Sequence, residues 1–433
     1  MRLPGNFETF RRLFALRNYR FYIAGVAASN VGVWVQRVAI GWLTWQLTES
    51  TAWLGGIAIA EAAPMIVLGL IAGTVVDRMD NLRLLRITQA MALLYSAALA
   101  ALTFSGAMTI WLLLAISILR GATMAFQRPS RMSLVFTLIG RELLPTGLAL
   151  NSMVFNGSRF VGPAIGGAII VVAGIGWAFV AAWVLFFLFT LALRRLSVPV
   201  APRRPRGGSF AAESWEGVRY IAAHAGIRMQ MVVLFATAFF ARPLIDLFPG
   251  FAAQVFAGGP ETLASLMSAL GLGAMGGGLF LAGRRGGTRG MTAVTLGAMG
   301  AASLALLAFA ATDALWLALP LAALLGMALI VLGIGNQTLI QSAVEPALRG
   351  RVISLYGTAA RATPSVGALI IGGLAETVGL RLPVAVGALL CLAVWAWAWR
   401  RRRVYADNLE GGPAAGAAPF SHGDKAASLR RSR

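Results

Sequence analysis

The stretch at residues 69–83, GLIAGTVVDRMDNLR, covers the end of one apolar run at 51–76 and the start of the next at 83–104. Each run is long enough to cross the ~30 Å hydrocarbon core of a bilayer, which takes roughly 20 helical residues. Within the stretch, Gly69 and Gly73 are four residues apart, a spacing that permits close contact between membrane helices. An acidic and a basic residue follow where the first run ends. The stretch therefore predicts two membrane helices joined by a short charged turn.

The composition of the whole chain supports this interpretation. Of its 433 residues, 58% are hydrophobic and only 12% are charged, whereas soluble domains carry roughly 25% charged residues. A bilayer accommodates so much apolar surface because lipid is itself an apolar solvent. Apolar runs recur along the chain at 19–46, 51–76, 83–104, 108–127, 144–171, 175–193, 229–256, 262–283, 290–311, 315–340, 352–375 and 382–399. We therefore predict an all-α integral membrane protein with about twelve transmembrane helices.

The basic residues are distributed unevenly between the two sides of the predicted membrane. The chain has 37 lysines and arginines, of which five lie well inside the expected spans and one, Arg381, lies in an outer loop. The other 31 fall in the inner segments or at the inner ends of the spans if the N-terminus is cytoplasmic. This asymmetry follows the positive-inside rule. It predicts a multi-pass protein of the cell (inner or plasma) membrane with both termini in the cytoplasm, and it explains the net charge of +21 without a nucleic-acid partner.

The longest inner loop divides the chain into two similar halves. We expect an N-terminal six-helix bundle at 1–193, a cytoplasmic linker at 194–228, a C-terminal six-helix bundle at 229–400 and a disordered basic tail at 401–433. The linker is rich in proline, glycine and arginine at first, and its residues 209–225 are predicted to form a short amphipathic helix on the membrane surface. GPAIGG at 162–167 and GALIIGG at 367–373 follow similar Glu/Arg-rich turns about 205 residues apart. Two pseudo-symmetric halves related as parallel repeats are a transporter architecture, with the substrate site between them.

Several function classes are excluded by what the sequence lacks. Cys391 is the single cysteine and His224 and His422 are the two histidines, so we expect no metal site. The chain has no phosphate-binding loop of the ATPase type. We therefore expect no cofactor and no enzymatic activity. Energy for transport would come from a gradient or from a partner, and we expect a monomer.

At residues 73–83 the sequence resembles the major facilitator superfamily. That superfamily carries a glycine, then Asp-Arg four residues later, then further basic residues between its second and third spans. Gly73, Asp77, Arg78 and Arg83 match this pattern, whereas Asp80-Asn81 replaces the usual Gly-Arg. The resemblance implies an inner gate latch that breaks and reforms during alternating access; the alternative is a simple topology anchor.

A second motif lies in the fifth expected span. NGSRFVGPAIGG at 156–167 contains Gly162, Pro163, Gly166 and Gly167 and resembles the superfamily's glycine-proline antiport motif of exporters. Proline removes a backbone donor and glycines permit close helix approach. The glycine-rich eighth span is the expected partner, and the alternative is static helix packing.

Further segments resemble the branch of the superfamily that contains enterobactin exporters and macrolide or multidrug efflux proteins. TESTAWLG at 48–55, EGVRYI at 216–221 and LRGRVISLY at 348–356 carry this resemblance, which extends from about residue 17 to 400. It implies efflux of a small molecule and leaves the substrate open.

Charged residues inside a membrane are costly and are functional candidates by default. The expected spans contain Arg37, Glu61, Arg120, Arg159, Arg242, Asp246 and Arg361. Arg242 and Asp246 are four residues apart, so we expect them to pair. Glu61 has no basic residue within four positions, which makes it the first candidate for proton coupling, with Asp246 as the second. An arginine from elsewhere in the sequence could lie close to Glu61 in the folded protein and reverse that ranking.

The remaining charges are candidates for the substrate cavity. We assign Arg37, Arg120, Arg159, Arg242, Arg361 and the aromatic Trp34 to it. The alternatives are structural ion pairs, arginines that extend to an interface, and an aromatic belt residue. Antiporters of the superfamily often have an arginine in the fourth span, although in this sequence Gly121 follows Arg120 directly.

These observations predict a secondary active transporter that exports a small amphipathic organic molecule, drug-like or siderophore-like, by proton antiport with rocker-switch alternating access. Because arginines outnumber acids in the spans, an exporter or importer of an anionic metabolite is the alternative. A transport-inactive membrane sensor or scaffold is the alternative of another class.

Overall fold

A computed structural model describes residues 5–196, 210–284 and 287–411. These residues are helical, with no strand among them. The N-terminal part comprises α1 Gly5–Ala15, α2 Arg17–Thr48, α3 Thr51–Arg78, α4 Asn81–Phe104, α5 Ile110–Ala173, α6 Ile175–Arg194 and α7 Phe210–Ala223. The C-terminal part comprises α8 Ala225–Ala236, η1 Thr237–Ala241, α9 Leu244–Gly250, η2 Phe251–Val255, α10 Pro260–Gly283, α11 Met291–Ala311, α12 Leu315–Ala343, α13 Arg349–Val378, α14 Arg381–Arg400 and α15 Arg402–Glu410.

Eleven helical segments of the described chain are long and apolar enough to cross a membrane. The twelfth expected span lies in α13, which is less apolar because it contains Arg349, Arg351 and Arg361. α5 contributes two spans, at Ile110–Gly140 and Glu142–Ala173. They are separated at Gly140, whose φ of 68° is a left-handed conformation that glycine adopts at low cost. The all-α membrane prediction is confirmed.

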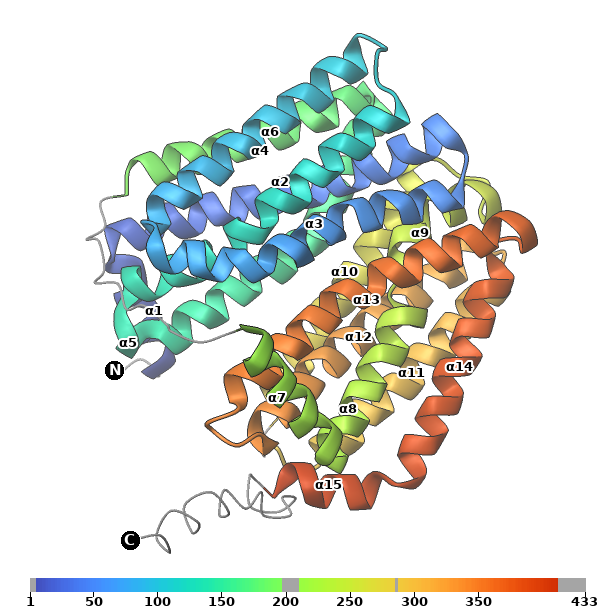
Figure 1. Ribbon diagram of the computed structural model, residues 1–433. Helices are drawn as coiled ribbons and strands as arrows, with labels where there is room; N and C mark the ends of the chain where they lie inside the picture. Colours follow the sequence, from blue (N-terminus) through green and yellow to red (C-terminus); the bar gives the residue numbers. More distant parts are fainter. Residues whose placement is uncertain (1–4, 197–209, 285–286, 412–433) are drawn as a thin grey trace, which may run out of the picture.

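The helices form two groups that face each other across the molecule (Figure 1). One group consists of α2 to α6, and the other consists of α8 to α14. The groups are joined by two long helix pairs, α3 with α13 and α5 with α10. The first and last described helices, α1 and α15, lie at the same end of the molecule. These two pairs therefore form the main contact between the groups.

The seventh expected span is irregular. Two π-helical turns, η1 and η2, flank the short helix α9, which begins after Pro243 and contains Pro249. Proline lacks a backbone donor and disrupts regular helical hydrogen bonding, and π-helical turns often occur at functional sites. This segment places Asp246 between the two groups.

The segments that the sequence assigns to the cytoplasmic side contain more helix than expected. Residues 210–223 form α7, as expected, and Glu216 binds Arg351 of α13 at 2.6 Å. The expectation of disorder from residue 401 is wrong for Arg402–Glu410, which form α15. The carboxylate of Glu410 accepts hydrogen bonds from the backbone N–H groups of Gly290 (2.6 Å) and Thr292 (2.9 Å) at the start of α11. The N-terminus of a helix attracts a carboxylate, so these hydrogen bonds hold α15 against the start of α11. Residues 412–433 lie outside the described residues.

Candidate functional site

A cavity of about 240 Å³ lies between the two helix groups. Helices of both groups contribute to its wall: α2, α3 and α5 from one, and α9, α10 and α13 from the other. Its charged lining residues are Arg37, Glu61, Arg120, Arg128, Arg242, Asp246 and Arg361. Apolar residues such as Ile57, Met65, Met124 and Met267 complete it. The cavity is therefore mixed in character, with more basic than acidic groups.

Asp246 forms an ion pair across the two groups. Its Oδ1 accepts a hydrogen bond from Nη2 of Arg37 on α2 at 2.6 Å. The predicted pairing of Asp246 with Arg242 is wrong in this structure, because Arg242 Nη1 instead donates to the backbone carbonyl of Ala360 at 3.4 Å. A new helix, α9, begins after Pro243, between the two residues. Arg242 and Asp246 therefore do not share one face of a continuous α-helix, as residues four positions apart otherwise would.

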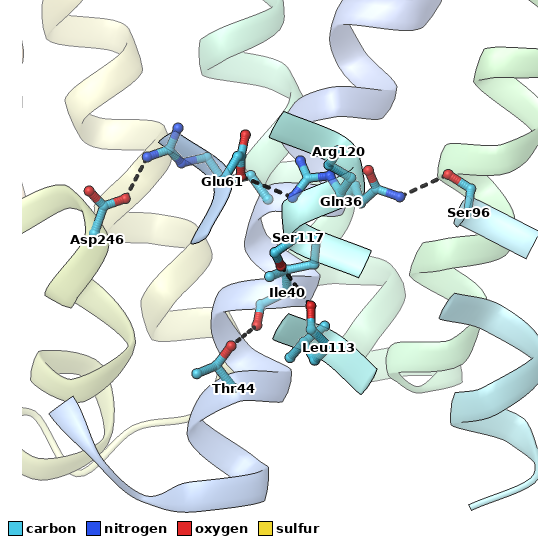
Figure 2. Close-up of polar contacts among 10 residues, drawn as sticks. Gln36, Ile40, Thr44, Glu61, Ser96, Leu113, Ser117, Arg120 and Asp246 are labelled. Carbon is cyan, nitrogen blue, oxygen red and sulfur yellow. Dashed lines mark hydrogen bonds and ion pairs between the residues drawn. The ribbon is translucent and has the colours of Figure 1, made fainter. Parts of the chain in front are cut away.

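Glu61 also has an arginine partner, contrary to the expectation from its local sequence. Its Oε2 accepts a hydrogen bond from Nη1 of Arg120 at 3.1 Å (Figure 2). The Arg120 side chain is 2% exposed and that of Glu61 is 28% exposed. Gly121 makes this pairing possible, because a Cβ at that position would overlap the backbone carbonyl of Glu61. The glycine directly after Arg120 thus brings α5 against α3.

Arg128 is a cavity residue that the sequence interpretation missed. It was assigned to an inner segment after a span ending at residue 127, whereas α5 continues to Gly140 and places Arg128 on the cavity wall. The signal was present in the apolar residues that continue beyond Pro129, including the buried Leu134 and Val135.

Two cavity candidates lie beside the described wall rather than on it. Trp34 and Arg159 are both buried. The guanidinium groups of Arg37 and Arg159 each lie 5.6 Å from the centroid of the Trp34 ring. Such cation–π contacts stabilise buried cations. We interpret Trp34 as a residue that stabilises the Arg37 side chain through this cation–π contact.

The end of the molecule away from α1 and α15 is closed by contacts between α3 and α13. Thr51 Oγ1 donates to the carbonyl of Gly372 at 2.8 Å. Glu376 accepts from Ser50 Oγ at 2.6 Å and from the Ala52 backbone N–H at 3.0 Å. These bonds join the start of α3 to the end of α13.

The glycine-proline motif packs against helices of both groups. A Cβ at Gly162 would lie 2.5 Å from Trp34 Cβ on α2, and one at Gly166 would lie 3.1 Å from Val35 Cα. Toward α10, Gly167 packs against Ala264. The motif, which includes Pro163 inside α5, therefore permits close packing on two sides.

The predicted inner latch is described only in part. The surroundings of Gly73 and the side chains of Asp77 and Arg78 are outside what the structure describes, and Arg83 is exposed. The latch stays a prediction. Among the described residues, no cluster of three histidine, cysteine or acidic side chains suits a metal ion.

Comparison with known proteins identifies the family. The sequence profile of the family described as transmembrane secretion effector (MFS_3) matches residues 13–415. The chain belongs to this family of the major facilitator superfamily. Its members are transporters and not enzymes.

Two curated relatives are transporters of this type. The chain is 27% identical to the multidrug efflux pump Tap of Mycolicibacterium fortuitum over 374 residues, covering 83% of this chain and 89% of Tap. It is 28% identical to the staphyloferrin A transporter of Staphylococcus aureus over 162 residues, covering 37% of this chain and 41% of that transporter. The second match thus spans less than half of that relative's length.

Solved structures share the fold. The nucleoside transporter NupG (D323A mutant) superposes with a TM-score of 0.68 at 13% identity, over 89% of this chain and 99% of that chain. A bacterial homolog of the human lysosomal transporter Spinster, inward-facing and unoccupied, gives a TM-score of 0.68 at 14% identity, over 91% and 98%. The architecture is therefore that of a major facilitator superfamily transporter.

Proposed function

We propose that the protein is a secondary active exporter of a small amphipathic organic molecule, driven by proton antiport and working by rocker-switch alternating access. The observation that carries this proposal is the cavity shared by both helix groups and closed at one end by the α3–α13 contacts. A cavity bounded by two movable groups can open to one side at a time. The similarity to Tap, which is named a multidrug efflux pump, supports export.

The positive-inside rule assigns the sides of the membrane in this proposal. The termini and the basic inner segments face the cytoplasm, so the closed end faces outward. Arg128, Arg242 and Arg361 are exposed on the cavity wall. In this state the substrate would therefore enter the cavity from the cytoplasm. The protein would lie in the cell (inner or plasma) membrane.

We assign proton coupling to Asp246 rather than to Glu61. The Arg37–Asp246 ion pair joins the two groups, whereas the Glu61–Arg120 pair lies within one of them. Protonation of Asp246 removes its charge and weakens the link that opposes rocking. Protonation of Glu61 would change the interior of one group only. The sequence-based ranking of the two carboxylates is therefore reversed.

A counterflow assay tests the proposal. Purified protein is reconstituted into proteoliposomes that contain a pH-sensitive dye, and cationic, neutral and anionic aromatic compounds are added outside. At least one class should exchange across the membrane and move protons in the opposite direction. A sensor or scaffold would support neither exchange nor proton movement with any class, and that result would reject the transporter proposal.

A further inference from the structure

We infer that the substrate is an organic anion with at least two acidic groups, one of which takes Arg37 from Asp246. This inference rests on the proposed transport function and names the substrate class of the same cavity.

The charge balance of the wall is the first argument. Five arginines and two carboxylates line the cavity. Both carboxylates are engaged, Asp246 with Arg37 and Glu61 with Arg120. In the described part of the chain, Arg128, Arg242 and Arg361 form no ion pair with a carboxylate. Cations within a membrane protein are costly unless they are paired, so these three favour a ligand that brings its own negative charge.

The position of the arginines indicates more than one acidic group. Arg128 lies on α5 in one helix group, whereas Arg361 lies on α13 and Arg242 adjoins α9 in the other. A guanidinium binds a carboxylate or phosphate through two parallel hydrogen bonds. A ligand with acidic groups at two ends can place one of them on an arginine of each helix group.

The uncharged wall indicates an organic ligand. Ile57, Met65, Met124, Ile245 and Met267 form apolar surface between the charged positions. Methionine side chains are flexible and polarizable, and they adapt to varied apolar shapes. An apolar body with acidic substituents fits this lining, whereas a small inorganic anion would leave the apolar surface uncovered.

Asp246 then acts as a tethered competitor of the substrate. Its carboxylate holds Arg37 at 2.6 Å while the cavity is empty, and the pair links the two groups. A substrate carboxylate releases this link by binding Arg37, and a proton releases it by neutralising Asp246. Once displaced, Asp246 stays on a cavity wall that Arg242 also lines. Substrate and proton therefore each permit reorientation separately, which is the condition for exchange.

Equilibrium binding to the purified full chain in neutral-lipid nanodiscs tests the inference. The probes are four di- and tricarboxylic acids, including naphthalene-2,6-dicarboxylate, each measured beside its methyl ester. At least one acid should bind ten times or more tightly than its ester, since ion pairs with arginine are lost on esterification. If each of the four esters binds as tightly as its own acid, the inference is overturned, and this test needs no variant.

Variants then test the competition for Arg37. Asp246→Asn should tighten binding of the acid by about tenfold, a change of about 1.4 kcal/mol. Glu61→Gln removes one negative charge from the same cavity but frees Arg120, whose side chain is only 2% exposed, and not Arg37, so it should tighten binding by less than about threefold. Arg361→Gln should weaken binding by about tenfold. Equal effects of Asp246→Asn and Glu61→Gln would contradict direct competition.

Counterflow of the same probes separates this inference from the proposed function. If the cation tetraphenylphosphonium exchanges in proteoliposomes and no acid binds, the transporter proposal stands and the anionic substrate is wrong. If an acid binds as described and no compound of any class exchanges, the anion site stands and the transporter proposal fails.

Discussion

Arg37 Nη2 and Asp246 Oδ1 lie 2.6 Å apart although their residues are 209 positions apart in the sequence. The pair joins α2 of one helix group to α9 of the other at the cavity wall. Its side chains are 42% and 18% exposed, so solvent reaches it and a proton can arrive from the cavity. An ion pair in this position links the charge state of one carboxylate to the relative position of the two groups.

Asp246→Asn should uncouple transport from the proton gradient. A gradient of one pH unit corresponds to about 1.4 kcal/mol, or tenfold accumulation for one-to-one exchange. We expect this accumulation to disappear in the variant while downhill flux continues, because the neutral amide no longer opposes rocking. Substrate accumulation in proteoliposomes with an imposed pH gradient measures both quantities. Full proton-driven accumulation by the variant would reject Asp246 as the coupling residue.

Glu61→Gln should mainly reduce stability. The substitution leaves the 2% exposed Arg120 side chain with a neutral partner, and the loss of a charged hydrogen bond costs about 1–3 kcal/mol. We expect a lower midpoint of thermal unfolding in detergent, with proton-driven accumulation retained in protein that remains folded. The exposed Glu49→Gln is the matched control and should leave the midpoint unchanged. An unaltered midpoint for Glu61→Gln would show that the pair adds little stability.

Gly55→Ala should destabilise the end of the molecule that the contacts between α3 and α13 close. A Cβ at this position would overlap the backbone of Ala368 in α13, and such overpacking costs about 1–3 kcal/mol. The neighbouring Gly56→Ala is the control, because its Cβ would make only an ordinary contact of 3.7 Å with Trp53.

The measurement for Gly55 is labelling of a cysteine that replaces Ala58 on the cavity wall, in a Cys391→Ala background. A membrane-impermeant maleimide added from outside should react faster in the Gly55→Ala protein and at the unchanged rate in the Gly56→Ala protein. Equal rates in both would contradict closure at this contact.

His224, which caps the start of α8, should make stability depend on pH. It is 4% exposed, and its Nδ1 accepts a hydrogen bond from the Ile227 backbone N–H at 3.3 Å at the start of α8. Burial lowers the pKa of His224 below its usual 6.5, outweighing the opposing effects of a backbone hydrogen bond and the charge of Glu345. Because the folded pKa is depressed, this stabilisation is present above pH 6.5 and is lost as the pH falls through the lower folded value.

Thermal unfolding between pH 5 and 8 checks the role of His224. The His224→Asn protein should keep the helix cap and unfold with a weaker pH dependence, whereas His224→Ala should lose about 1 kcal/mol at neutral pH. If the wild type and the Asn variant lose stability equally below pH 6.5, another group is responsible.

Reporter fusions test the assigned sidedness. A reporter fused after Gly207 or Gly412 should be cytoplasmic, and one near Gly106 or Asp313 should be outside, because basic segments remain in the cytoplasm. The reverse result at any two of these sites would reject the topology.

Most of the membrane helices could be predicted from the sequence. The expected span at 175–193 corresponds to α6, Ile175–Arg194, and that at 290–311 corresponds to α11, Met291–Ala311. Hydropathy succeeds because each membrane helix satisfies its backbone hydrogen bonds within its own segment. Hydropathy failed at the end of the fourth span. It placed that end at residue 127, whereas α5 remains helical up to the kink at Gly140, and it therefore left Arg128 outside the span.

The sequence by itself determined which charges enter the membrane, since Arg37, Glu61 and Asp246 stand within long apolar runs. Only the tertiary structure decided their partners. Local spacing indicated Arg242 for Asp246 and no partner for Glu61, whereas packing of distant helices pairs them with Arg37 and Arg120. The physical reason is that helix formation depends on residues within a few positions, while an ion pair depends on which helices pack together and at what distance.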